Sequence, residues 1–141
     1  MSAETAESHV MSLIYTTLSS DTTLMAIIQG IYDDVAPYGS SFPHVVLIVQ
    51  SDETITAIAP RNVSRVYDNI VVLVKVVDQQ DSYETVRIAM NRIDVLLSAA
   101  YNSYVKGFIR EDLIKFVENS AADTPPFRHL GYMYHTIATN S

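Results

Sequence analysis

Apolar residues fill two segments in the middle of the chain in a pattern typical of buried β-strands. Residues 43–50 place Val45 and Leu47 on one face of a strand and Val46 on the other. Residues 70–77 are also largely apolar on both faces, and Lys75 is their charged residue. A strand of this kind needs cover on both sides of its sheet. We therefore expect both segments in the interior of a sheet, with the second segment central.

Weaker signals extend this sheet. Residues 54–59 form an extended stretch that ends at Pro60-Arg61-Asn62, so we expect a hairpin whose long second arm is residues 63–77. The C-terminal third predicts strands at 104–109, 113–118 and 127–139, with a small-residue loop at 119–126.

Helical spacing appears at two places. Apolar residues from Val10 to Leu18 predict a first helix, and Asp21 caps a second short helical turn that Gly30 ends. A capping box from Asp81 to Glu84 predicts a longer helix of about 19 residues, by its 3.6-residue period. The apolar stripe of this helix comprises Val86, Ala89, Met90, Ile93, Leu96, Leu97 and Ala100.

The order of these elements predicts the fold class. A helix, a strand-rich block, a second helix and a second strand-rich block indicate an α/β (α+β) fold in which residues 1–141 form a single domain. We expect a mixed, mainly antiparallel sheet with helices packed on one face. The other face is covered either by a second layer of the same chain or by a neighbouring subunit. Repeated head-to-tail use of such a contact would close a ring.

Composition and charge narrow the classes of function. The chain has no cysteine, and its apolar runs are far shorter than the roughly 20 residues of a membrane-spanning helix, so we expect a soluble protein. Glu4 and Glu7 precede the first apolar residues, which is unlike a secretory signal. The net charge is −7, and the first 60 residues hold seven acidic residues and no Lys or Arg. We do not expect an acidic N-terminal half of this kind to bind nucleic acid, although it suits a surface that DNA passes. The simpler interpretation is that it keeps the protein soluble.

A search for catalytic and ligand motifs finds little. The sequence contains no nucleophile elbow and no glycine-rich phosphate loop. His129 and His135 lie on one strand at a spacing of roughly 20 Å, too far apart to share a metal ion. The acidic pairs at 33–34 and 52–53 are interpreted as solvated loop residues. We therefore expect a non-enzymatic protein with no metal and no cofactor, whose nine tyrosines serve packing and contacts between subunits.

The order of short motifs resembles the tail terminator or tail-completion (tail-to-head joining) proteins of long-tailed bacteriophages. The resemblance covers about residues 8–138 and lies in degenerate motifs. It departs from the usual family pattern at residues 77–80 and in the lack of any Trp, which leaves the subfamily open. The motifs are Asp21 to Leu24, Ile31-Tyr32, Ala36-Pro37, Pro43 before a Val-rich strand, the strand at 70–77, the helix from Tyr83-Glu84 to Leu96-Leu97, and the strand from His129 to Tyr134.

The resemblance implies a virion structural protein of the neck region, assembled in the host cytoplasm. Such proteins form a homo-oligomeric ring, here expected to be a hexamer, which caps the head-proximal end of the tail tube and stops its polymerisation. The ring contacts the tail tube protein and the head-completion or connector protein, and genome DNA passes through its lumen without specific binding. The alternatives are a connector adaptor of the neck and a small ligand-binding or enzymatic α/β domain.

Two segments are expected to supply the contacts of this ring. The first is the long loop, with Asp33, Asp34, Tyr38 and Phe42. The second lies beside the 119–126 loop and contains Phe127, Arg128 and His129. Loops on a rigid scaffold are common contact sites. The alternative interpretation is that these residues only shape their loops.

Overall fold

The computed structural model describes residues 5–59 and 62–140, and their side chains apart from those of residues 55–66. One five-stranded sheet, in the order β1-β2-β3-β5-β4, runs through the molecule. β1 pairs with β2 in parallel and all other pairs are antiparallel, so the predicted fold class is confirmed, and β3 is central. The elements are α1 (Ala6–Ser19), α2 (Thr22–Met25), β1 (Ile31–Asp33), β2 (His44–Ala59), β3 (Asn62–Gln79), α3 (Glu84–Ser98), β4 (Val105–Glu118) and β5 (Phe127–Thr139).

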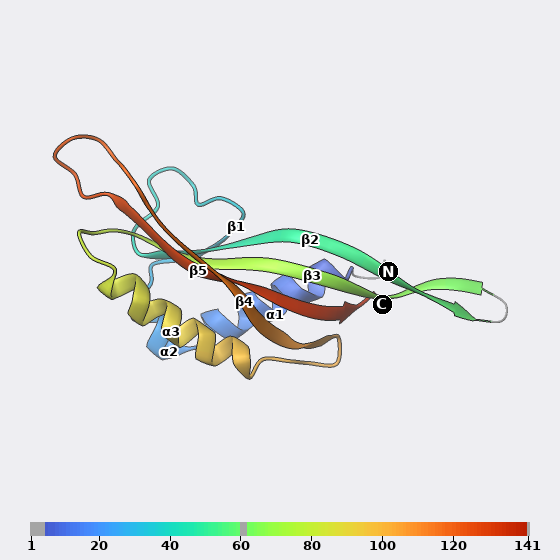
Figure 1. Cartoon of the computed structure of the whole chain (residues 1–141). Coiled ribbons are helices and arrows are strands. Elements are labelled where there is room, and N and C mark those ends of the chain that lie inside the picture. The colour runs from blue at the N-terminus through green and yellow to red at the C-terminus, as the bar shows by residue number, and fades with distance from the viewer. Residues whose placement is uncertain (1–4, 60–61, 141) are drawn as a thin grey trace.

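The helices lie on one face of the sheet, as Figure 1 shows. The core forms between this face and the apolar stripes of α1 and α3, because alternate strand residues point toward the helices. Each large apolar side chain that is fully buried there contributes roughly 1.5–3 kcal/mol of transfer free energy. The buried core residues include Val10, Ile14, Leu18, Val45, Leu47, Ile70, Val72, Val74, Val76, Val86, Ala89, Met90, Ile93 and Leu97.

β2 and β3 form a long hairpin that projects well past the helices (Figure 1). The pairing of the two strands extends from the His44–Val77 pair to the Ala59–Asn62 pair. The register shifts at two places, after Val49 and after Ile55. The stretch at 54–59, expected as a weaker separate segment, is the end of the 16-residue β2. The hairpin itself is confirmed, and residues 60–61 of the predicted turn lie outside the described residues.

β4 differs from the prediction. The sequence predicts two strands, at 104–109 and 113–118, but one strand runs from Val105 to Glu118. Its register against β5 shifts between Arg110 and Leu113. The polar residues at this point form a bulge, which bends a strand without ending its pairing.

The helix ends were predicted with mixed success. The Asp21 carboxylate accepts the Leu24 N–H at 2.8 Å, which confirms the predicted cap. α2 ends at Met25, several residues before Gly30. The prediction of a capping box formed by Asp81 and Glu84 is wrong, because α3 begins at Glu84 itself, with Tyr83 as its N-cap. A capping box requires the glutamate two positions further into the helix.

Candidate assembly interface

The sheet face opposite the helices carries a row of four side chains, one from each of four neighbouring strands. His44 of β2 lies opposite Val77 of β3, Val77 lies opposite His129 of β5, and His129 lies opposite Phe116 of β4. The rings of His129 and Phe116 stack, with centroids 4.1 Å apart. Residues opposite each other in register share a face, so this row crosses most of the sheet.

The next row contains Lys75, the charged residue of the apolar 70–77 segment of the central strand. Lys75 lies opposite Val46 on β2 and Gly131 on β5. A Cβ atom at position 131 would lie 2.6 Å from Cα and Cβ of Lys75, so glycine allows β3 and β5 to approach here. The Lys75 Nζ reaches a point 5.5 Å from the centroid of the Phe116 ring, a cation–π distance.

The connection between β1 and β2 lies over these rows, on the side of the sheet away from the helices (Figure 1). Phe42 at its end stacks on His44, with centroids 4.9 Å apart, and contacts Phe127 at 5.5 Å. The Tyr32 ring meets His44 edge-on at 5.5 Å. These aromatic contacts attach the connection to the sheet and partly provide the second layer that the apolar strands need.

A cavity of about 720 Å³ lies between this connection and the sheet. Its floor includes Val46, Lys75 and Val77, and its walls include Phe42 and Phe127. At the rim, Tyr38 and Val35 are exposed to solvent. A second cavity, of about 530 Å³, lies between the end of α3 and β4 and contains none of the predicted contact residues.

The two histidines of the cavity are held as neutral imidazoles at neutral pH. Burial lowers the pKa of His129, against the opposing effect of its contact with Glu118, whose Oε1 lies 3.0 Å from Nε2. The buried Nδ1 of His129 has no hydrogen-bond partner. Burial also lowers the pKa of His44, whose Nδ1–H donates to the Ser41 carbonyl at 3.1 Å. The histidines therefore add little positive charge to the cavity at pH 7.

The structure brings five of the seven predicted contact residues to one place. Those that line the cavity are Asp34, Tyr38, Phe42, Phe127 and His129. Asp33 is the exposed last residue of β1, not part of the loop. Whether these residues make contacts between proteins stays a prediction.

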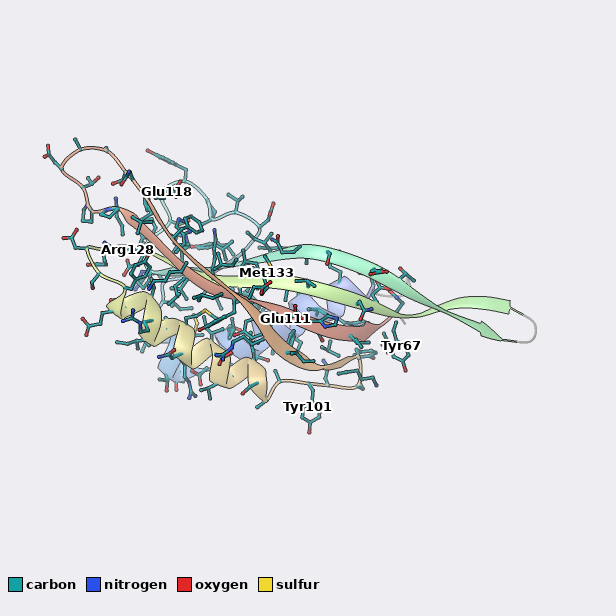
Figure 2. All side chains as sticks on the ribbon, in the orientation of Figure 1. Tyr67, Tyr101, Glu111, Glu118, Arg128 and Met133 are labelled. Atoms are coloured by element: carbon teal, nitrogen blue, oxygen red, sulfur yellow. The ribbon has the colours of Figure 1, made fainter. Side chains whose placement is uncertain are left out.

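Arg128 lies on the other face of the sheet. Its guanidinium donates to the carbonyls of Gln80 and Asp81 and sits 4.7 Å from the centroid of the Tyr83 ring. Figure 2 places Arg128 toward α3, whereas Glu118 lies toward the opposite side. The alternation of a strand explains this, because residues 127 and 129 point one way and residue 128 the other.

Sequence reasoning missed several residues of this site, namely His44, Lys75, Phe116 and Glu118. Lys75 carried a usable signal, because a lysine within the otherwise apolar 70–77 segment must have a polar partner or access to water for its ammonium group. The other three lie at ends of strands whose pairing order could not be inferred. Within the part of the chain that the structure describes, no group of three His, Asp or Glu side chains is arranged to hold a metal ion, and no helix is long and apolar enough to cross a membrane.

The chain is similar to known proteins in structure but not in sequence. No model of a known protein family matches the chain, and no curated protein matches its sequence. In structure, the chain is similar to one chain of the virion of a native gene transfer agent (GTA) particle, with a TM-score of 0.63. The similarity covers 93% of this chain and 95% of that chain, at 13% sequence identity. At this identity the likeness shows a shared fold.

Proposed function

We propose that the chain is a structural protein of a phage or phage-like virion. The observation that carries the proposal is the likeness to a chain of the GTA virion, which extends over nearly the whole length of both chains. A fold alone does not fix a function, so the proposal also rests on the surface described above. That surface combines a cavity with exposed apolar residues at its rim, a combination typical of contact sites between proteins.

Within the virion, we propose that the protein forms a hexameric ring at the head-proximal end of the tail tube. Two sheet edges support a head-to-tail contact between copies. β4 is an edge strand with exposed apolar side chains at Ile109, Leu113 and Val117. At the other edge, β1 pairs only with residues 45–47 of β2, so the rest of β2 has no further strand beside it among the described residues. Two different edges that meet repeatedly build a ring when the rotation between copies closes, and the proposal assigns this closed form to the protein.

The ring would act by binding and not by catalysis. One of its faces would match the last ring of the tail tube protein, and its other face would present a different surface to the head-completion or connector protein. Tube growth would then stop, and genome DNA would pass through the lumen without specific binding. The protein would assemble in the host cytoplasm and reside in the neck of the finished virion.

Electron microscopy of particles that lack this gene tests the proposal. A terminator role predicts filled heads separate from tails of irregular and often excessive length, and restoring the gene should restore normal particles. Tails of normal length that fail to join heads would instead assign the protein to the connector side of the neck. Intact infectious particles without the gene would contradict both roles.

A further inference from the structure

Lys75 brings a positive charge into the cavity without a close counter-ion. Its side chain is about half buried, and none of the described residues places a carboxylate within ion-pair distance of its Nζ. Glu118 attracts it only from a longer distance, because the Glu118 carboxylate contacts His129. Burial lowers the pKa of Lys75, since the charged ammonium has lost part of its water. A carboxylate brought to this position would recover part of that cost.

The other charged groups around the cavity do not act as a counter-ion for Lys75. Asp34 also lines the cavity, but it lies in the exposed connection and is solvated. Water and salt screen its effect far more than they screen charges near a half-buried group. The neutral imidazoles of His44 and His129 offer no competing positive charge. Lys75 is therefore the group that would select the charge of an occupant.

The walls of the cavity favour an occupant that has an apolar group next to the charge that faces Lys75. Phe42, Phe127, Val46 and Val77 present aromatic and aliphatic surface next to the lysine. Pockets of roughly 300–1,000 Å³ accommodate ligands the size of a few side chains, and this cavity falls in that range at about 720 Å³. The exposed Tyr38 and Val35 extend the apolar surface beyond the cavity mouth, as a macromolecular partner would require and a small metabolite would not.

We propose that the cavity receives an acidic segment of a neighbouring virion protein, in which an Asp or Glu is followed by an aromatic or large aliphatic residue. The carboxylate pairs with Lys75, and the apolar side chain packs against the exposed sides of the Phe42 and Phe127 rings. This inference rests on the proposed function and deepens it, because it names the chemistry of the partner surface. The open sheet face is completed by the partner, and the lysine gives that contact its specificity.

Binding of two short peptides to the purified full chain tests the inference. The probes are N-acetyl-Asp-Phe-amide, its Asn-Phe counterpart, and inorganic phosphate, each followed through the NMR signal of the Gly131 amide, which lies opposite Lys75 on the neighbouring strand. We expect the Asp peptide to bind about five times or more tightly than the Asn peptide, because an ion pair at a partly buried site contributes that much. Lys75→Met should remove this preference, and Asp34→Asn should strengthen it modestly.

Lys106→Met provides the matched control, because Lys106 also lies over an aromatic ring, 5.9 Å from the Tyr67 centroid, but lines the other cavity. This variant should keep the preference for the Asp peptide. Equal binding of the two peptides to the unaltered protein, or no binding of either, would overturn the inference, as would phosphate that competes fully with the Asp peptide. None of these results depends on ring assembly, so the proposed function would stand or fall separately.

Discussion

The ring of Phe42, just before β2, packs against the ring of Phe127, the first residue of β5, with centroids 5.5 Å apart. This contact joins two segments that are far apart in the sequence. It is possible because β3 lies between β2 and β5, and Phe127 pairs with Gln79 at the end of β3. The long β1–β2 connection and the region beside the 119–126 loop therefore form one surface, on which the proposed contacts would be made.

The rim of the cavity offers the most direct test of this surface by mutation. Tyr38 is fully exposed, so Tyr38→Ser should change the free energy of unfolding by no more than about 0.5 kcal/mol. Its incorporation into particles should nevertheless fall about tenfold, because exposed aromatic residues at contact sites often dominate binding. Quantitative immunoblotting of purified particles, with melting curves of the free protein, measures both effects.

Tyr101→Ser is the control for this experiment. Tyr101 is an exposed tyrosine after α3, beside the other cavity, away from the β1–β2 connection (Figure 2). It should leave both stability and incorporation unchanged. Equal loss of incorporation in the two variants would show that the rim has no special role.

The close packing around Gly131 predicts that even a substitution by alanine strongly destabilises the fold. A Cβ atom there would collide with the Val74 carbonyl oxygen and with Lys75 of the neighbouring strand. Gly131→Ala should therefore destabilise the fold by about 1–3 kcal/mol, the usual cost of an overpacked interior. Urea denaturation measures the loss.

Gly39→Ala gives the contrasting case. Gly39 has a φ of +84°, but a Cβ atom added there would have no other atom within 4 Å. Substitution should cost only about 1 kcal/mol, from backbone conformation alone. A loss at position 131 no larger than that at position 39 would mean that β5 can shift away from β3.

The local elements could be predicted from the sequence because each depends on short-range periodicity. The stripe of α3 and the alternation of β3 are clear in the residue order, and the buried residues match them. The bulge of β4 was taken for a break, because polar residues at 110–112 resemble a turn and only the continuous partner strand β5 shows otherwise.

The site could be predicted only in part, because it depends on strand order. Phe42 and Phe127 were both expected at contacts, but nothing in the sequence places them together. Arg128 was grouped with its neighbours, although alternation along β5 sends it to the helical side. Lys75 was noted only as the charged residue of the 70–77 segment, because its importance depends on the cavity that the β1–β2 connection forms above it.

The ion pair of Asp21 and Arg92 predicts an acid-dependent part of the stability. Hydrogen bonds from Arg92, at 2.9 and 2.6 Å, lower the pKa of Asp21 from 3.8 to about 2. A carboxyl group whose pKa is lower in the folded state than in the unfolded state makes its full contribution to stability when the pH is above the unfolded-state pKa. This contribution is lost as the pH falls toward the folded-state pKa of about 2.

Asp21→Asn isolates this effect, because asparagine still caps a helix but carries no charge. The variant should melt at a lower temperature than the unaltered protein at pH 6, and the difference should shrink steadily as the pH falls below 3.8. Melting curves by circular dichroism across this range measure it. A difference that stays constant with pH would contradict the assignment to the ion pair.

The 119–126 loop should be dispensable for folding. Its hydrogen bonds connect its own residues, such as Ser120 to Thr124 at 2.6 Å and Ser120 to the Pro125 carbonyl at 2.8 Å. Replacement of residues 120–125 by Asn-Gly should leave the melting temperature nearly unchanged, because exposed loops of small residues tolerate change. Particle assembly should be weakened, since the loop lies next to Phe127. Normal tails in such a mutant would count against a contact role for the loop.

A cryo-electron microscopy reconstruction of the neck of the virion that carries this protein would show where the chain sits and how many copies assemble. We expect a ring of six copies of this chain on the head-proximal end of the tail tube. In that ring, the rim at Tyr38 and the cavity above Lys75 should be covered by a neighbouring protein. A ring with this surface facing solvent, or a chain located in the capsid or at the far end of the tail, would rule out the proposed role.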